Sequence, residues 1–597
     1  MSGLAGCFFT GEVGCVEPAR SGLASTFAGL NRDPQSYVDG DVALFVASHS
    51  ARAGFLGSFA ELIESDQYVL ALEGYILNLL DLVGAGDRDA QSSRGEVLLK
   101  IFARHGAAIA EKLNGGYNFV IWNKSEKIAT VSNCKFGQRN LYTIPTGGGI
   151  TIASDLQALK QLSGKAFELN SDTAWMSFLY GGVYGSATPL KNVTKVLPGS
   201  TLIVRAGSVT ECFARDIPKA HTSSVRHEKG FYVNQLDTLM RQAASRLGSA
   251  ADTHAVMVGS GVDSSLVAAY GKGEIKNLVA VTQQMPGDLD ESKEAARMVK
   301  ALGIPHKIVS YEPLAGDLLK EISAFVRIVE EPAYWNQLGP PLLHLLGSLR
   351  DLPQSFLTGA EGDLLFYFRS PRRASLAQII RNGLFWPVAD YTARRLVNRV
   401  TRHTYIVGSD FDLLDRSLMR RHITVDCTAW ESEPGFYNPS YAHLEAGPNA
   451  QRHFINNGWQ NVRIISQLAR EVGCEVFFPY LDDDVVSCVL SLPDEMKINK
   501  ILLRILLAKF LSPDAVPTKK KGYWAHTIKW HYEIGALEGV LDLMSQRKTV
   551  ERGVYNPQAL RALIDAYASK VAQPRYHPVL WQLLVFEMFC REFVDGL

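Results

Sequence analysis

Hydrophobic residues in the first 206 positions fall in short runs that are separated by turn-forming residues. Turn signals such as Asp39-Gly40 and Pro198-Gly199 stand just before two of these runs. Short apolar runs bounded by such residues predict β-strands rather than helices. The N-terminal part is therefore expected to be rich in strands, at residues 42–46, 68–72, 117–122 and 201–205.

The pattern changes after the polar residues 219–229, which are expected to form a linker. Beyond them, apolar strand-like runs alternate with longer segments of helical spacing, such as residues 291–302. This alternation predicts a parallel α/β sheet. Helical periodicity dominates from residue 376 onward. The strands expected in this second part are residues 255–258, 278–282 and 307–310.

Composition and length narrow the class of protein. A chain of 597 residues predicts two or more domains, and 47% hydrophobic with 20% charged residues is typical of a globular protein. The formal net charge of zero provides no overall field for nucleic acid or an anionic membrane. The eight cysteines stand singly, so a C-x-x-C zinc or redox motif is excluded. With neither a signal-peptide pattern nor an eighteen-residue apolar run, we expect a cytoplasmic protein.

A turn rich in glycine and serine joins the strand at 255–258 to a predicted helix. Glycines let the backbone approach phosphate oxygens, and the N–H groups at a helix start attract them. The hydroxyls of Ser264 and Ser265 would add donors, and Asp263 would hold magnesium. The alternative is an ordinary strand–turn–helix in which Asp263 is only a cap. The residues expected to contact ATP here are Val258, Gly259, Ser260, Gly261, Asp263, Ser264 and Ser265.

This turn resembles the S-G-G-x-D-S loop of ATP-pyrophosphatase enzymes, although residues 259–261 run Gly-Ser-Gly. Further motifs follow in the order found in asparagine synthetases, over about 350 residues, and we identify the chain as similar to that family. The motifs are Asp290-Glu291-Ser292, Glu330-Glu331-Pro332, residues 357–366 (similar to S/T-G-x-G-x-D), Pro479-Tyr480-Leu481-Asp482, Lys500 with Leu503-Arg504, and residues 518–523 (similar to R-x-K-x-G-F, with threonine for arginine).

The resemblance implies a site for ATP and Mg²⁺. Asp263 and Asp363 should share the metal, and Val258, Thr282 and Gly359 should enclose the adenosine. Lys520 corresponds to the family's lysine that stabilises charge on the acyl-adenylate, with its neighbours Lys519 and Lys521 as alternatives. The expected fold of residues 230–597 is a parallel-sheet α/β ATP-pyrophosphatase domain, similar to the adenine nucleotide α-hydrolases, with a helical C-terminal part.

Residues 1–215 resemble the glutaminase domain of asparagine synthetases, which implies an Ntn-hydrolase-like β-sandwich with αββα layers. That chemistry needs an N-terminal cysteine, but Ser2 follows Met1 here. Glu73 replaces the family's oxyanion asparagine, and its charge would repel an oxyanion. We therefore predict a degenerate domain without glutamine hydrolysis. The resemblance is carried by residues 73–78, Leu113-Asn114-Gly115-Gly116-Tyr117, Gly137 with Leu141-Tyr142, and Ala153-Ser154-Asp155.

Without a glutaminase, the amine must come from free ammonia or from the substrate itself. β-Lactam synthetases and lasso peptide macrolactam synthetases share this loss, and both join an amine and a carboxylate within one molecule. Ala360 stands where asparagine synthetases have glutamate and β-lactam synthetases have tyrosine. Residues 362–366 are more similar to the G-G-D-x-L-F of lasso cyclases. Glu361 would serve as the base if it points inward, although a surface position is an equal alternative.

We therefore predict an ATP- and magnesium-dependent macrolactam synthetase that closes the isopeptide ring of a lasso peptide. Its expected partners are a linear precursor peptide, a leader protease and a leader-recognition protein, with no nucleic acid or membrane. Eight arginines within residues 369–403 would steer an acidic peptide, unless they are solvated helical faces. The alternatives are a β-lactam-type or ammonia-dependent asparagine-type synthetase, and a non-catalytic ATP-binding scaffold.

Overall fold

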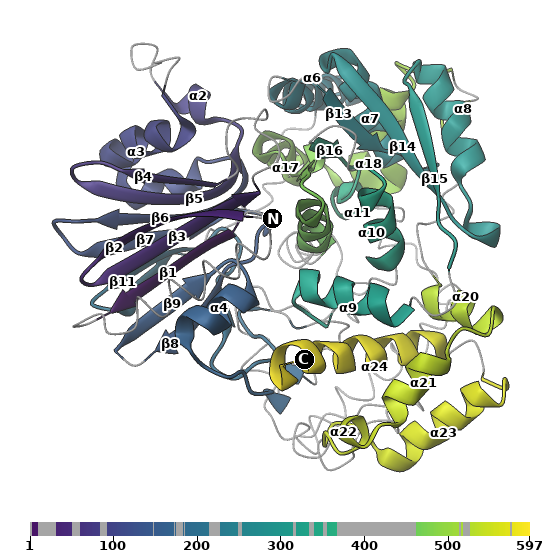
Figure 1. Ribbon diagram of the computed structural model, residues 1–597. Coiled ribbons are helices and arrows are strands. Elements are labelled where there is room, and N and C mark those ends of the chain that lie inside the picture. Colours follow the sequence, from purple (N-terminus) through teal and green to yellow (C-terminus); the bar gives the residue numbers. More distant parts are fainter. Residues whose placement is uncertain are drawn as a thin grey trace, which may run out of the picture.

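The N-terminal part of the computed structural model contains two antiparallel six-stranded sheets (Figure 1). The structure describes residues 3–9, 32–49, 60–83, 92–146, 148–171, 173–174, 183, 185–213, 227–248, 253–313, 318–332, 339–349, 355–366, 461–512, 515–517, 526–572 and 576–596. The first sheet has the order β10(Thr194–Lys195)-β8(Tyr142–Thr146)-β9(Gly149–Ala153)-β1(Gly3–Phe9)-β3(Val42–His49)-β2(Arg32–Asp39). The second has the order β12(Ser208–Phe213)-β11(Thr201–Arg205)-β7(Ile128–Asn133)-β6(Gly115–Asn123)-β5(Tyr68–Ile76)-β4(Ala60–Glu64).

The two sheets pack face to face. Alternate side chains of facing strands meet in one apolar cluster, including Leu44 of the first sheet and Val120 of the second. Helix α3 (Arg94–His105) covers the outer face of the second sheet, and α4 (Leu156–Ser163) packs against the first. Ser93 and Glu96 close the start of α3 as a reciprocal capping box. The resulting layers of helix, two sheets and helix agree with the expected amidotransferase-type domain.

The second domain is built on five parallel strands in the order β15(His306–Ser310)-β14(Asn277–Gln284)-β13(Thr253–Met257)-β16(Ser355–Leu357)-β17(Glu475–Phe477). Helices α6 (Lys229–Gly248), α7 (Val262–Glu274) and α8 (Ser292–Leu302) precede or connect the first strands. The chain steps outward from β13 to β15 and then returns to the other side of β13 with β16. Ligands of open parallel sheets bind where the strand order reverses in this way, outside the carboxyl ends of the strands.

Most elements predicted from the sequence are confirmed, with small shifts at their ends. All seven predicted strands are present, and the helix predicted at 291–302 is α8. Two predictions need comment: the linker at residues 219–229 and the helical C-terminal part. The linker prediction was wrong at its C-terminal end because Lys229 is already the first residue of α6, and residues 219–226 all lie outside the described part. The described residues between 461 and 596 are mainly helical, as predicted, but they also contain the unpredicted strand β17.

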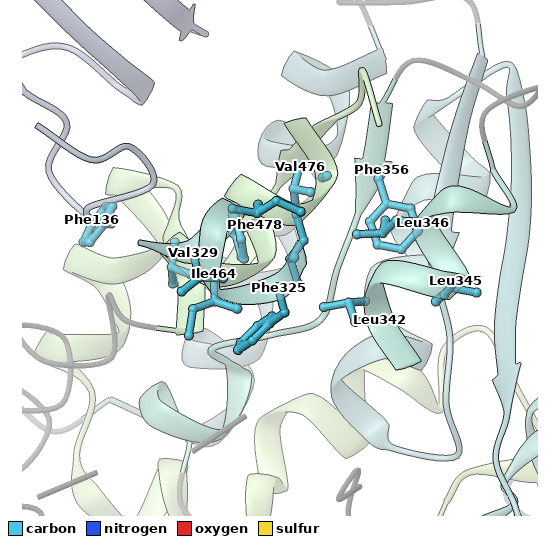
Figure 2. Close-up of a cluster of buried hydrophobic side chains, with 14 of the residues drawn as sticks. Phe136, Phe325, Val329, Leu342, Leu345, Leu346, Phe356, Ile464, Val476 and Phe478 are labelled. Atoms are coloured by element: carbon cyan, nitrogen blue, oxygen red, sulfur yellow. The ribbon is translucent and has the colours of Figure 1, made fainter. Parts of the chain in front are cut away.

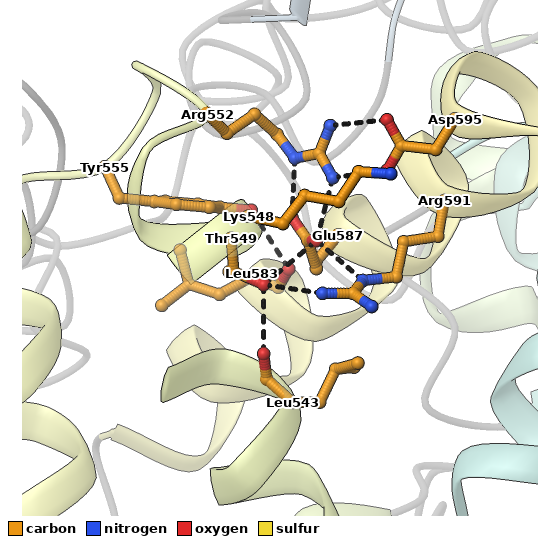
Figure 3. Close-up of polar contacts among 9 residues, drawn as sticks. All are labelled: Leu543, Lys548, Thr549, Arg552, Tyr555, Leu583, Glu587, Arg591 and Asp595. Carbon is orange, nitrogen blue, oxygen red and sulfur yellow. Dashed lines mark hydrogen bonds and ion pairs between the residues drawn. The ribbon is translucent and has the colours of Figure 1, made fainter. Parts of the chain in front are cut away.

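The largest apolar core continues across both domains. Phe136 of the N-terminal domain belongs to the same buried cluster as Val329, Ile464, Val476 and Phe478 of the second domain, and Figure 2 shows all five. A buried cluster of polar and charged side chains joins the helices of the C-terminal part. There, Glu587 of α24 (His577–Phe589) accepts hydrogen bonds from Arg552 and Arg591 and from the Thr549 hydroxyl (Figure 3). Burying the Glu587 charge is tolerable only because these cations surround it.

None of the helices within the described residues combines the length and the apolar character that crossing a membrane requires.

Candidate active site

The turn between β13 and α7 is folded tightly onto itself. Gly259 N–H donates to Ser264 Oγ over 3.2 Å, and Ser260 N–H donates to Glu291 Oε2 over 2.9 Å. The buried Ser265 donates its hydroxyl to the Gly261 carbonyl over 2.6 Å. In this structure the N–H groups of Gly259 and Ser260 are thus bonded within the protein, ahead of the helix start at Val262. Ser265 stabilises the turn from within.

Two glycines let the loop after β16 approach the start of α7. A Cβ atom at Gly359 would lie 2.5 Å from the Ser264 nitrogen, and one at Gly362 would lie 2.8 Å from Asp263 Oδ1. Any larger residue would push the two segments apart. Asp363 follows Gly362 at the start of α11 (Gly362–Leu365), so this close approach brings Asp363 next to Asp263.

Lys500 lies between these two carboxylates. Its Nζ contacts both Asp263 Oδ2 and Asp363 Oδ1. The Lys500 side chain is 1% exposed, that of Asp263 is 11% exposed and that of Asp363 is 45% exposed. Lys500 precedes α19 (Ile501–Leu507), and both Asn499 and Lys500 have positive φ angles, 55° and 54°. Non-glycine residues adopt this region at a cost, which is typical of functional sites.

Glu361 is buried beside Asp363 and has a φ of 72°. Burial, with a smaller contribution from the Asp363 charge, raises the pKa of Glu361 to about 8. The alternative of a surface position is therefore wrong. A carboxyl group with such a pKa exchanges its proton near neutral pH, which suits a general base. Ala360, immediately before it, donates its N–H to Thr358 Oγ1 over 3.1 Å.

Thr282 links neighbouring strands behind the turn. Its hydroxyl donates to the Val258 carbonyl over 2.7 Å, and His306 Nε2 lies 2.8 Å from the same hydroxyl. Burial lowers the pKa of His306, so the ring is neutral at neutral pH. Val258 and Thr282 are both buried, and they fix the backbone at the carboxyl ends of β13 and β14.

Lys500 belongs to one of the motifs that carry the family resemblance, but no role in the site was predicted for it from the sequence. The family motif had placed the functional lysine at Lys520, but residues 518–525 lie outside the described part of the chain, as do Lys519 and Lys521. The same holds for the arginines of residues 369–403. The signal that could have indicated Lys500 is its place in the motif with Leu503-Arg504.

The two aspartates fit a magnesium ion that is shared with a polyphosphate. Both reach the same Lys500 Nζ, so their oxygens face a common point that already holds one positive charge. Among the described residues no group of three or more histidine, cysteine or acidic side chains is arranged so that it could hold a metal ion by itself. Two protein carboxylates leave the remaining positions of an octahedral ion to phosphate oxygens and water, as magnesium prefers.

Glu73, which the resemblance aligns with the family's oxyanion asparagine, forms a buried ion pair. Glu73 contacts Arg470 of the second domain, and its Oε1 lies 3.3 Å from Arg139 Nη1. Burial alone would raise the pKa of Glu73, but the charges of Arg470 and Arg139 outweigh it and lower that pKa. Glu73 is therefore a carboxylate whose charge is already neutralised. It offers no hydrogen-bond donor to an oxyanion.

Comparison with protein families matches both parts of the chain. Residues 235–591 match the asparagine synthase family, and residues 61–214 match the glutamine amidotransferase domain family.

Individual relatives agree with these family matches. The chain is 23% identical over 565 residues to asparagine synthetase [glutamine-hydrolyzing] 1 of Bacillus subtilis (strain 168), covering 88% of this chain and 85% of the relative. It is 21% identical over 486 residues to a putative asparagine synthetase [glutamine-hydrolyzing] of Mycobacterium tuberculosis (strain ATCC 25618 / H37Rv), covering 75% and 72%.

Among solved structures, glutamine phosphoribosylpyrophosphate amidotransferase from B. subtilis, complexed with ADP and GMP, matches with a TM-score of 0.26 and 14% identity. The match covers 51% of this chain and 65% of that chain, which is less than two thirds of it. A TM-score this low does not establish a shared fold.

Proposed function

Because the chain belongs to the asparagine synthase family, whose members form amide bonds at the expense of ATP, we propose that it is a macrolactam synthetase that joins a carboxylate and an amine of one linear peptide. The ATP-dependent step is supported by the cluster of Asp263, Lys500 and Asp363, which lies where the strand order of the parallel sheet reverses. The observation that favours an amine within the substrate is Glu73 in the place of an oxyanion donor.

In the first step, an oxygen of an Asp or Glu side chain in the peptide attacks the α-phosphorus of ATP, and pyrophosphate leaves. Asp263 and Asp363 would hold magnesium, which when bound neutralises part of the polyphosphate charge. Lys500 is a fixed and almost fully buried cation at the same point. A preorganised cation in a site with little water stabilises charge that develops in the transition state.

In the second step, the N-terminal amine of the peptide attacks the activated carbonyl, its proton passes to a base, and AMP leaves. Glu361 is the proposed base, since its pKa of about 8 lies near that of an α-amine. Holding both groups of one peptide in a single site makes the reaction intramolecular, which favours ring closure. A leader protease and a leader-recognition protein would supply the linear peptide.

Two alternative functions would use the same residues. A β-lactam-type or ammonia-dependent asparagine-type synthetase would use the same adenylating cluster, and Ala360 weighs against both because it cannot assist proton removal. A non-catalytic ATP-binding scaffold would retain nucleotide binding only. The joint presence of Lys500, two carboxylates and a buried Glu361 favours catalysis, because a scaffold has no need of a carboxyl group poised near neutral pH.

Mass spectrometry of a linear core peptide incubated with the protein, ATP and magnesium tests the function, with AMP followed in the same reaction. We expect the peptide to lose one water with formation of an equal amount of AMP. The leader protease and leader-recognition protein should be present, and tandem mass spectra of the product should place the new bond between the N-terminus and an acidic side chain.

Other outcomes separate the alternatives. AMP formation with small amino acids but not with peptides would favour the small-molecule synthetases, and no AMP with any acid would favour the scaffold. Glutamate release from added glutamine would contradict the predicted loss of glutaminase chemistry.

Replacing Glu361 with glutamine is expected to slow amide formation about 100-fold or more, because an amide cannot accept the proton. The ratio of wild-type to Glu361→Gln rates should rise with pH through about 8, where half of the Glu361 carboxyls have lost their proton, and should level off above that pH. Taking this ratio removes the titration of the substrate amine, which affects both enzymes equally. Pyrophosphate exchange should persist, since adenylation removes no proton from the amine.

Glu538→Gln, an exposed glutamate on α21 (Glu538–Ser545), is the matched control. A pH-independent ratio would show that Glu361 is not the base.

A further inference from the structure

Four charged side chains form a buried network across the boundary between the two domains. Glu73 and Arg139 belong to the N-terminal domain, while Arg470 and Glu475 belong to the second domain. Arg139 Nη2 lies 2.6 Å from Glu475 Oε1, and Glu73 contacts both arginines. All four are at most 6% exposed, and their formal charges cancel.

The network ends on a strand that adjoins the ATP site. Glu475 is the first residue of β17, and β17 pairs in parallel with β16. The Tyr75 hydroxyl of the N-terminal domain donates to the Val476 carbonyl over 2.9 Å, and the Tyr75 ring lies 4.5 Å from that of Phe477. The N-terminal domain therefore contacts each of the three residues of β17.

Two contacts lead from β17 to the aspartate and loop of the ATP site. Thr358, which begins the loop bearing Gly359 and Asp363, donates its N–H to the Phe477 carbonyl over 3.1 Å. Tyr480 lies three residues after β17, and its hydroxyl donates to the backbone carbonyl of Asp263 over 3.2 Å. The segments that carry Asp263 and Asp363 are thus both hydrogen-bonded to residues 477–480. This part of the chain is the end of β17, which the N-terminal domain contacts, and the segment directly after it.

We propose that Glu73 is a positioning residue of the synthetase: its ion pair with Arg470, together with Arg139 and Glu475, fixes β17 and Tyr480 so that Asp263 and Asp363 are held ready for Mg·ATP. This inference rests on the proposed use of ATP. It gives the degenerate amidotransferase domain a role in the chemistry of the other domain, at the position where its own oxyanion donor is missing.

The network predicts a specific pattern of loss and rescue. Glu73→Gln removes the carboxylate and leaves the buried Arg470 charge without it, which is costly in a low-dielectric interior. Adding Arg470→Met removes that charge too, while Arg139 keeps Glu475. Replacing both members of a buried pair is far less disruptive than removing one.

Isothermal titration calorimetry of Mg·ATP with the full-length chain tests the proposal. We expect Glu73→Gln to weaken binding by about 3- to 30-fold, the range of couplings carried through packed networks. The Glu73→Gln/Arg470→Met variant should return to within about twofold of wild type, the limit of ordinary additivity. Glu64→Gln, which breaks the exposed pair of Glu64 with Lys124 in the same domain, should change nothing.

Thermal unfolding of each variant separates positioning from mere stability. A Glu73→Gln protein that is less stable but binds Mg·ATP as wild type does would overturn the proposal, and so would failure of Arg470→Met to rescue binding. If Glu73→Gln does not fold, Tyr480→Phe tests the proposal instead, because it removes the hydrogen bond from Tyr480 to the Asp263 carbonyl. Unchanged Mg·ATP affinity in Tyr480→Phe would overturn the proposal. Absence of Mg·ATP binding by the wild-type chain would instead contradict the proposed function.

Discussion

Asp363→Asn is expected to lower ATP-dependent AMP formation by about a thousandfold, because loss of a metal-binding carboxylate removes several kcal/mol of charge stabilisation. Asparagine has the same shape, so the close approach of Gly362 to Asp263 is preserved. Asp363 is about half exposed, and its removal is therefore expected to leave folding stability nearly unchanged. The measurement is AMP release with the peptide substrate, together with the unfolding temperature.

The matched control for this prediction is Asp542→Asn, an exposed aspartate on α21. It removes the same charge from the same domain away from the carboxylate pair, and AMP formation should be unchanged. If Asp363→Asn retains more than about a tenth of wild-type activity, where one decade corresponds to 1.36 kcal/mol, the pair of aspartates does not hold the metal.

The parallel sheet could be predicted because its central strands β13 and β14 are largely buried apolar runs that alternate with helical segments, and this alternation is visible in the sequence. β13, β14 and β15 were found in this way. β16 and β17 were not, because three residues are too few to show a period, and their strand state depends on pairing with β13 and with each other. Asp263 was singled out by the glycine-rich turn before it, whereas Asp363 was singled out only by the resemblance to asparagine synthetases.

The parts of the site that the sequence did not predict depend on tertiary contacts. Whether Glu361 faces inward is decided by its positive φ angle and by the packing of Gly362 on Asp263. Glu73 could be singled out from the sequence as a predicted replacement of an oxyanion donor, but its partner Arg470 lies 397 positions away in sequence. No local pattern links residues so far apart, so their ion pair appears only in the folded chain.

Lys500→Met is expected to reduce AMP formation by about 100- to 1000-fold, the usual effect of removing one preorganised group that stabilises transition-state charge. Methionine keeps the length of the apolar stem, so the packing before α19 is largely retained. The charge between Asp263 and Asp363 is lost, so the two carboxylates repel each other without a cation between them. Added magnesium should therefore raise the unfolding temperature more in this variant than in wild type.

Lys520→Met, measured in parallel, decides which lysine serves the chemistry. If Lys500 is the cation of the site, Lys500→Met loses adenylation and pyrophosphate exchange, while Lys520→Met keeps most of both. If Lys520 is the family's lysine, the losses are reversed, and Lys500→Met shows a change in stability that magnesium corrects without loss of rate. Comparable losses in both variants would mean that the reaction needs both lysine cations. Measuring pyrophosphate exchange and amide formation separately then assigns each lysine to its step.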